Sequence, residues 1–195
     1  LEKGFRLQEV FDMGAQVSAD VTMPLVTMVS YAIVLRIGPE KYVARAKAAG
    51  IDGAIVPDLP SEEAKSLSKI CAAHDFSLIQ LVTPTTSADR ALTIAETSTG
   101  FLYYVSVTGI TGERTALPSE LADNVQSLRE KIDLPICIGF GINEPAHIKM
   151  LAPVADGLIV GSAIVRRIAN LADHSREAVL KDVGEYVAEM IAALA

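Results

Sequence analysis

The sequence predicts an α/β protein in which buried parallel strands alternate with amphipathic helices. Short apolar runs rich in Val, Ile and Leu recur along the 195 residues. They lack the strict polar alternation of strands that have one face in water, which is typical of strands covered on both faces. A helical pattern follows each run after a connection of a few residues. The chain is therefore a repeated βα unit, which builds a parallel sheet with right-handed crossovers.

Six segments have the character of such strands, and helical patterns lie between them. The strands are expected at 24–30, 53–57, 76–83, 101–106, 135–139 and 156–160. The helices are expected at 1–20, 39–49, 61–74, 87–97, 119–132, 143–151, 162–170 and from Ser175 onward. Pro39 in a first turn and Gly50 as a stop mark the limits of one helix.

Two architectures fit this order: an open doubly wound sheet and a (β/α)8 barrel. A complete barrel has eight βα units and typically about 250 residues. No dinucleotide-binding Gly-x-Gly-x-x-Gly follows a strand, which disfavours an open sheet of that kind. The array is therefore an open sheet, or a barrel that lacks two of its units.

The composition excludes several classes of protein. Half of the residues are hydrophobic, which is enough for a packed core and too many for a disordered chain. The net charge of −7 argues against a nucleic-acid-binding protein. The uncharged run 21–35 contains Pro24 and is too short to cross a membrane. Cys71 and Cys137 lie in apolar runs, which indicates reduced thiols inside the cell. The histidines lack metal-ligand spacing, so we expect no metal site.

Glycines follow the last three predicted strands. The loop 106–118 contains Gly109 and Gly112, Gly141 follows the next strand, and Gly161 precedes a helix that opens with Ser162. Bare backbone N–H groups and the start of a helix are suited to hold an anion. Taken singly, these features also fit an exposed loop, a tight turn and a plain helix cap by Ser162. Together they favour a barrel, because barrels commonly bind phosphate after their last two strands.

Other polar residues give weaker signals. Asp58 stands between two prolines at a strand end, where either a catalytic carboxylate or a turn aspartate is equally expected. Glu113 and Arg114 fit a solvated pair better than a catalytic one. The residues alone thus predict an enzyme that handles a phosphorylated small molecule.

Several motifs resemble the alpha subunit of tryptophan synthase. The segment Gly109-Ile110-Thr111-Gly112 at the end of 103–112 is the most specific of them. The segments 139–142 and 161–165 also occur in other phosphate-binding barrels, and 55–63 completes the likeness. The resemblance extends from residue 1 to the end of the chain. It implies one partial (β/α)8 TIM-barrel domain over 1–195, with about six βα units.

The resemblance implies a lyase of tryptophan biosynthesis. The reaction would be the retro-aldol cleavage of indole-3-glycerol phosphate to indole and glyceraldehyde 3-phosphate, in the cytoplasm. No cofactor is implied for this chain, since pyridoxal phosphate belongs to the beta subunit, the partner in an alpha2-beta2 heterotetramer. By position, the phosphate would bind at Gly112, Gly141, Gly161 and Ser162. The indole would lie against Tyr103, Phe140, Met28, Ile55 and Leu81, with Thr111 on the loop that closes over it.

This chemistry requires an acid that protonates indole C3 and a base that removes a proton from a glycerol hydroxyl. In the family these groups are a Glu at the end of the second strand and an Asp in the next loop. The resemblance places both before Leu1, in the two units that the strand count lacks. We therefore expect residues 1–195 to be inactive alone. Unpaired strand edges at 24–30 and 156–160 would make the isolated chain poorly soluble or oligomeric.

One segment departs from the family pattern. Residues 30–34 replace a Tyr-Asn-Pro-type turn that helps to dock the beta subunit. Two alternatives therefore stay open beside the alpha subunit. One is another phosphate-binding barrel, an isomerase or epimerase of a phosphosugar. The other is a non-catalytic remnant that only binds a partner.

Overall fold

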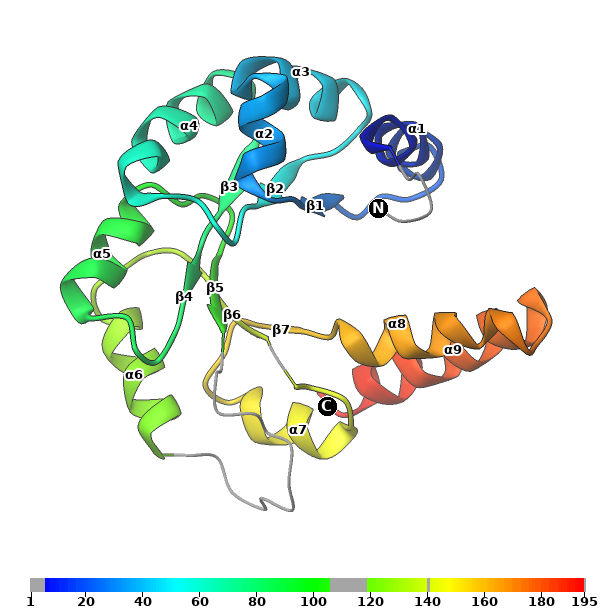
Figure 1. Cartoon of the computed structure of the whole chain (residues 1–195). Helices are drawn as coiled ribbons and strands as arrows, with labels where there is room; N and C mark the ends of the chain where they lie inside the picture. The colour runs from blue at the N-terminus through cyan, green and yellow to red at the C-terminus, as the bar shows by residue number, and fades with distance from the viewer. Residues whose placement is uncertain (1–5, 106–118, 140, 195) are drawn as a thin grey trace. The chain divides into compact units, whose positions relative to one another are not determined.

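The computed structural model describes residues 6–105, 119–139 and 141–194, which belong to two compact units. The first unit comprises Leu1–Leu81 and Thr93–Leu102, and the second comprises Val82–Leu92 and Tyr103–Ala195. Strands and helices alternate through both (Figure 1). The strand pairs in which Val26 faces Gly53, Gly53 faces Ser77 and Cys137 faces Gly157 are parallel, as the sequence predicts.

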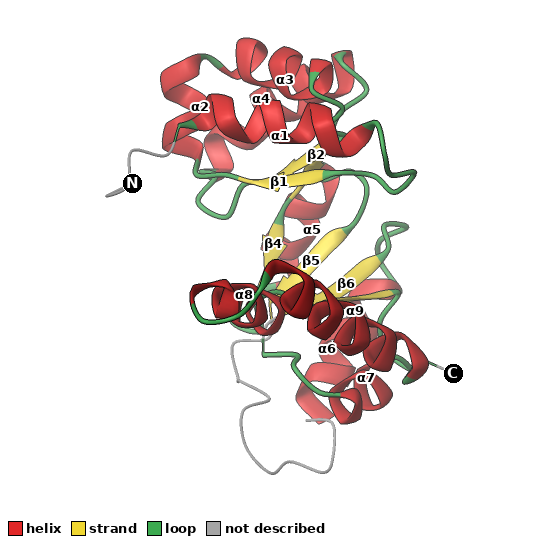
Figure 2. Ribbon diagram, turned by 90° about the vertical axis from the view of Figure 1, so that its right-hand side faces the viewer, coloured by secondary structure: helices red, strands yellow, loops and turns green. Residues whose placement is uncertain are grey.

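The first unit packs helices on a three-stranded sheet with the order β1-β2-β3. Its helices lie on the same side of that sheet (Figures 1 and 2). The elements are α1 (Leu7–Ser18), β1 (Val26–Met28), α2 (Tyr31–Ile37), α3 (Pro39–Ala48), β2 (Gly53–Ile55), α4 (Ser61–Ala73) and β3 (Ser77–Ile79). The core between them is apolar, and it includes Val34, Val43 and Leu78, whose side chains are fully buried.

The remaining strands form a second sheet with the order β4-β5-β6-β7. The elements are β4 (Leu81–Val82), α5 (Ala88–Glu96), β5 (Leu102–Val105), α6 (Ser119–Arg129), β6 (Ile136–Gly139), α7 (Pro145–Leu151), β7 (Gly157–Ile159), α8 (Ser162–Ala169), the 3-10 helix η1 (Asn170–Ala172) and α9 (Arg176–Ala192). Helices α8 and α9 form an antiparallel pair (Figure 1).

Each of the six predicted strand segments contains a strand, but 76–83 is divided in two at Gln80. The Gln80 side chain is buried, and its Nε2 donates to Thr97 Oγ1 at 2.7 Å and to Ile94 O at 3.3 Å. A buried amide must find such partners. Gln80, which stands between β3 and β4, therefore binds residues at and just after the end of α5.

Residues 30–34, which depart from the turn of the family pattern, form the start of a helix, since Tyr31 begins α2. The Ser30 hydroxyl donates to Asp58 Oδ2 at 2.6 Å, and the Tyr31 N–H donates to Asp58 Oδ1 at 2.7 Å. Asp58 comes from the loop after β2, so this carboxylate satisfies a donor of the first helical turn. A carboxylate distant in sequence thus supports this helix.

A reciprocal pair of hydrogen bonds fixes the amino ends of neighbouring strands. The Leu25 N–H donates to Asp52 Oδ2 at 3.0 Å, and the Asp52 N–H donates to Leu25 O at 2.7 Å. The same two bonds join Ile136 and Asp156, at 2.8 and 2.9 Å. In both cases the aspartate is followed by a glycine that begins the next strand. This contact sets which residues face each other across the strand pair.

Thr99 makes the corresponding contact with β3. Its N–H donates to Leu78 O, and its hydroxyl accepts from the Leu78 N–H, both at 2.8 Å. Gly100 follows Thr99 just as glycine follows each aspartate. In all three contacts, a side-chain oxygen that precedes a glycine accepts a backbone N–H of the neighbouring strand segment.

Strands β1 and β7 are outer strands of their sheets, as predicted, and Met28 on β1 is 62% exposed. The association of the isolated chain stays a prediction.

Within the described ranges, no helix combines the length and apolar character that a membrane crossing requires.

Replacement of Asp156 by alanine should lower the free energy of unfolding by about 1.5–3 kcal/mol, because it removes a charge-assisted hydrogen bond and the ion pair with Arg129. The exposed Asp173 is the control, and Asp173→Ala should stay within about 0.5 kcal/mol of the parent. Urea unfolding of the three proteins measures both effects. Equal stability of the two variants would contradict the proposed role of Asp156.

The pH dependence of the Asp156 contribution has a definite sign. The Ile136 N–H, above all, and the Arg129 guanidinium lower the pKa of Asp156, while burial opposes them. The stabilisation is therefore complete above the unfolded pKa, near about 3.9, and is lost as the pH falls through the folded pKa. The stability difference between the parent and Asp156→Ala should shrink in that acid range.

Candidate functional site

The carboxyl ends of β6 and β7 meet at one cavity of about 230 Å³. The two strands pair in the register Gly139 with Ile159, and a glycine follows two residues after each of these positions. Gly141 and Gly161 therefore leave the sheet at the same level. The cavity is lined by Tyr103, Gly141, Ile142, Asn143, Ile159, Gly161, Ser162, Ala163 and Arg166, all of which belong to the second unit.

Tyr103 on β5 forms an apolar wall of this cavity. Its side chain is 8% exposed, and its ring lies against Gly139, where an added Cβ would come within 2.5 Å of Tyr103 Cε2. Only glycine leaves room for the ring at this position. Burial raises the pKa of Tyr103, so the phenol stays protonated at neutral pH.

Two glycines of the cavity are required for different reasons. Gly141 has φ +79°, a left-handed conformation that other residues adopt at a cost. Gly161 shows no such strain, and an added Cβ would meet no heavy atom within 4 Å. Protein packing does not demand glycine at 161. The missing side chain instead leaves the backbone open to a ligand.

The start of α8 adds donors to the cavity. Gly161 occupies the N-cap position, Ser162 is the first helical residue, and no side chain caps the turn. The interpretation of Ser162 as a plain N-cap is therefore wrong. The first N–H groups of a helix have no intrahelical partner, and the helix dipole makes this end positive. The turn is thus suited to an anion.

The predicted site residues fall into three groups. Tyr103, Gly141, Gly161 and Ser162 lie together around the cavity, as just described. Gly112, Thr111 and Phe140 lie outside the described residues. Met28, Ile55 and Leu81 belong to the first unit, where Met28 and Ile55 are paired at the carboxyl ends of β1 and β2.

Sequence reasoning missed several lining residues, of which Asn143 and Arg166 are polar. The Asn143 N–H donates to His147 Nδ1 at 3.4 Å, and its carbonyl accepts from the Tyr186 hydroxyl at 3.1 Å. Nothing local in the sequence announces these contacts. Arg166 stands four residues after Ser162, a spacing that places two side chains on one helix face. That spacing could have identified it.

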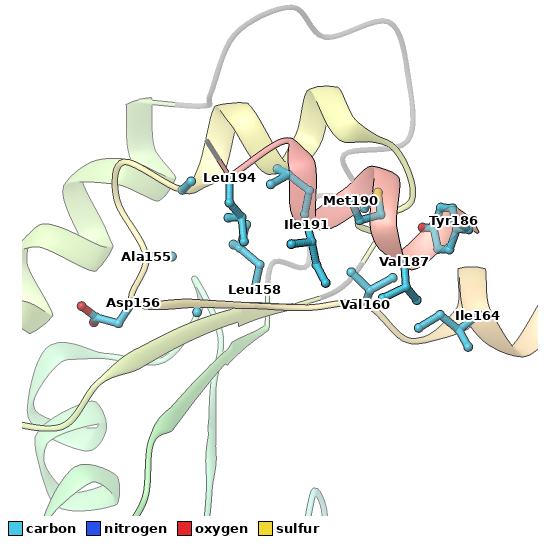
Figure 3. Close-up of a pocket in the computed structure, with 13 residues that line it drawn as sticks. Ala155, Asp156, Leu158, Val160, Ile164, Tyr186, Val187, Met190, Ile191 and Leu194 are labelled. Atoms are coloured by element: carbon cyan, nitrogen blue, oxygen red, sulfur yellow. The ribbon is translucent and has the colours of Figure 1, made fainter. Parts of the chain in front are cut away.

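A second cavity, of about 260 Å³, lies on the opposite face of β7 (Figure 3). Leu158 and Val160 line it, whereas Ile159 lines the first cavity, because successive strand residues point to opposite faces. Its other lining comes mainly from apolar residues of α7 and α9, among them Met190 and Ile191. It lies between the sheet and its covering helices and lacks the glycine turns of the first cavity.

Asp58 is engaged in structure and is poorly suited to donate a proton. The hydrogen bond from Ser30, first, and that from the Tyr31 N–H lower the pKa of Asp58, so the carboxylate stays ionised. The turn interpretation is therefore favoured over the catalytic one. Glu113 and Arg114 lie outside the described residues. In the ranges that the structure covers, no three His, Cys, Asp or Glu side chains gather as metal ligands.

Comparison with known proteins gives one consistent result. The family model described as tryptophan synthase alpha chain matches residues 1–195. A tryptophan synthase alpha chain of Rhodopirellula baltica is 62% identical over 179 residues, or 90% of this chain, and one of Chloroflexus aggregans is 42% identical over 99% of it. This chain spans 64% and 72% of the lengths of these two relatives.

A solved structure shows the same fold. It is a structure of the tryptophan synthase a2b2 complex from the hyperthermophile Pyrococcus furiosus. The matched chain is 31% identical, the TM-score is 0.87, and the match covers 98% of this chain and 76% of that chain. The predicted α/β fold of the (β/α)8 barrel class is thereby confirmed.

Three Gly→Ala variants separate ligand contact from packing. Gly161→Ala should weaken the binding of inorganic phosphate about tenfold while stability changes by less than about 1 kcal/mol, because only a ligand would meet the new methyl group. Gly139→Ala should destabilise the fold by about 1–3 kcal/mol through overpacking against Tyr103. Thermal unfolding and phosphate titration measure these effects.

Gly184→Ala on α9 is the matched control. A Cβ there also meets no atom within 4 Å, so it should gain about 0.5–1 kcal/mol of stability from helix propensity and keep the parent affinity. If Gly161→Ala bound phosphate as tightly as Gly184→Ala, the cavity would not be the anion site.

Proposed function

The chain belongs to the tryptophan synthase alpha chain family, and on this premise we propose that it serves the retro-aldol cleavage of indole-3-glycerol phosphate to indole and glyceraldehyde 3-phosphate. The observation that carries the proposal is the cavity after β6 and β7, where two glycine turns and an uncapped helix start face a buried tyrosine. Such a site suits a ligand with one anionic end and an apolar body.

The phosphate is proposed to bind the backbone of Gly141, Gly161 and Ser162, with Gly112 completing the set. Backbone N–H groups at a helix start hold phosphate through short, charge-assisted hydrogen bonds. The positive φ of Gly141 and the open Cβ position of Gly161 support this role. The hydroxyl of Ser162 does not cap the helix, and it is a further donor at the same place.

The indole is proposed to lie against Tyr103. This ring is held by its fit on Gly139 and stays uncharged, as an apolar wall requires. Phe140, Met28, Ile55 and Leu81 are proposed as further walls, with Thr111 on the loop that covers the ligand. We further propose that residues 1–195 form one partial barrel domain, which is supported by the match of 98% of the chain to one solved subunit.

The reaction breaks a C–C bond, adds a proton to indole C3 and removes one from a glycerol hydroxyl, which becomes the aldehyde. The described lining of the cavity includes no carboxylate that could perform either transfer. Asp58 is held ionised at the start of α2. We therefore propose that residues 1–195 provide ligand binding and that the acid and base, a Glu and an Asp, come from outside them.

The proposal includes a partner and a location. As the Pyrococcus furiosus structure is of an a2b2 complex, we propose that this chain docks on a beta subunit, which carries the pyridoxal phosphate, and that it needs no cofactor itself. The site of this chemistry would be the cytoplasm. Copurification with a beta subunit is the direct readout, and α2 is the segment whose substitution should alter it.

Ligand titration of the 195-residue chain tests the proposed function. Indole-3-propanol phosphate should bind more tightly than ribulose 5-phosphate, because Tyr103 offers an apolar wall rather than sugar-binding groups. The same sample should release no detectable indole from indole-3-glycerol phosphate. Preferential binding of ribulose 5-phosphate would favour an isomerase or epimerase. Robust indole release would show that residues 1–195 contain the acid and base, with Asp58 and Glu113 as the first candidates.

A further inference from the structure

We propose that Arg166 makes the cavity selective for a doubly charged phosphate ester over singly charged or neutral analogues. This inference rests on the proposed function, since it concerns the same cavity, and it assigns a role that the backbone donors do not fill. Arg166 is the only charged side chain among the described residues that line the cavity. Its guanidinium therefore sets the sign of the charge there.

The position of Arg166 on α8 directs it toward the helix start. It lies four residues after Ser162, and such a pair shares one helix face. Side chains in a helix lean toward its N-terminus, so the Arg166 side chain extends over the turn that contains Ser162. Both residues line the same cavity, which agrees with this geometry.

The neighbouring Arg167 is committed to another contact. Its Nε lies 3.6 Å from Asp182 Oδ2, and its guanidinium carbon lies 3.8 Å from the centre of the Tyr186 ring. These contacts attach α8 to α9. Arg166, by contrast, forms no ion pair with any described residue. Arg167 thus attaches α8 to α9, whereas Arg166 lines the cavity. Successive residues of a helix point in different directions, which allows these two roles.

The full positive charge of a guanidinium discriminates between ligands of different charge more strongly than the partial charges of backbone N–H groups do. The N–H groups of the glycine turns and the helix start act as about half a positive charge and hydrogen-bond any tetrahedral anion. The Coulomb attraction of a guanidinium grows in proportion to the ligand charge. A phosphate ester carries about −1.5 to −2 at pH 7, whereas the corresponding sulfate ester carries one negative charge. Arg166 should therefore favour the phosphate.

The test compares three ligands that share the indole-3-propanol body and end in a phosphate, a sulfate or a hydroxyl group. Arg166→Gln should weaken the phosphate ester about 5- to 20-fold and the sulfate ester about 2- to 4-fold, the range expected for one charge-assisted contact. The neutral alcohol should bind as before. The affinity of the parent for the phosphate ester should fall with added NaCl more steeply than that of Arg166→Gln.

Two further variants complete the comparison. Arg166→Lys should recover part of the phosphate affinity, because it keeps the charge and loses the planar fork. Arg176→Gln removes another exposed arginine, at the start of α9, and should change none of the three affinities. Thermal unfolding of every variant checks that α8 remains folded.

The possible outcomes distinguish a failure of the role proposed for Arg166 from a failure of the proposed function. If the parent chain fails to bind the phosphate ester, the proposed function is wrong. If the parent binds it and Arg166→Gln binds it equally well, only the role of Arg166 is overturned. A uniform loss for all three ligands would also overturn that role, since it would show a structural effect rather than recognition of charge.

Discussion

The parallel register of β6 on β7 is the constraint on which the candidate site depends. Asp156 sets it at the amino end by exchanging two hydrogen bonds with Ile136. At the carboxyl end the same register brings Gly141 and Gly161 to one level. A slip of one residue would turn every side chain of β7 to the opposite face. The residues that stabilise the fold and those that form the site thus lie at opposite ends of the same strands, as is usual in barrels.

Side chains alternate between the two faces of β7 and point in successive directions around α8. Neighbouring residues can therefore have different roles. Ile159 contributes to the glycine-lined cavity, while Leu158 faces the apolar cavity beneath α9. Arg167 holds α9 through Asp182, and Arg166 remains for the cavity. The contact of Tyr103 with Gly139 adds the apolar wall. Among the described residues, the lining of this cavity comes from one strand pair, one neighbouring strand and the first turns of a short helix.

The sequence predicted those features that depend on local pattern. The six strand segments and the glycines that follow the last strands are examples, because buried parallel strands and backbone-lined anion sites have direct signatures in residue type. Features that depend on distant partners were not predictable. The first turn of the helix at Tyr31 relies on Asp58, and the buried amide of Gln80 relies on Thr97. Ser162 resembled a cap because its place relative to the first turn depends on backbone angles.

The central claim is that two glycine turns and a helix start converge on one anion. Amide NMR of the chain during titration with inorganic phosphate tests it most directly. The N–H signals of Gly141, Gly161 and Ser162 should shift together with a single affinity. The amides of Leu158 and Gly184, on the apolar cavity and on α9, should stay in place. Separate affinities for the first three signals, or larger shifts at Leu158, would contradict the claim.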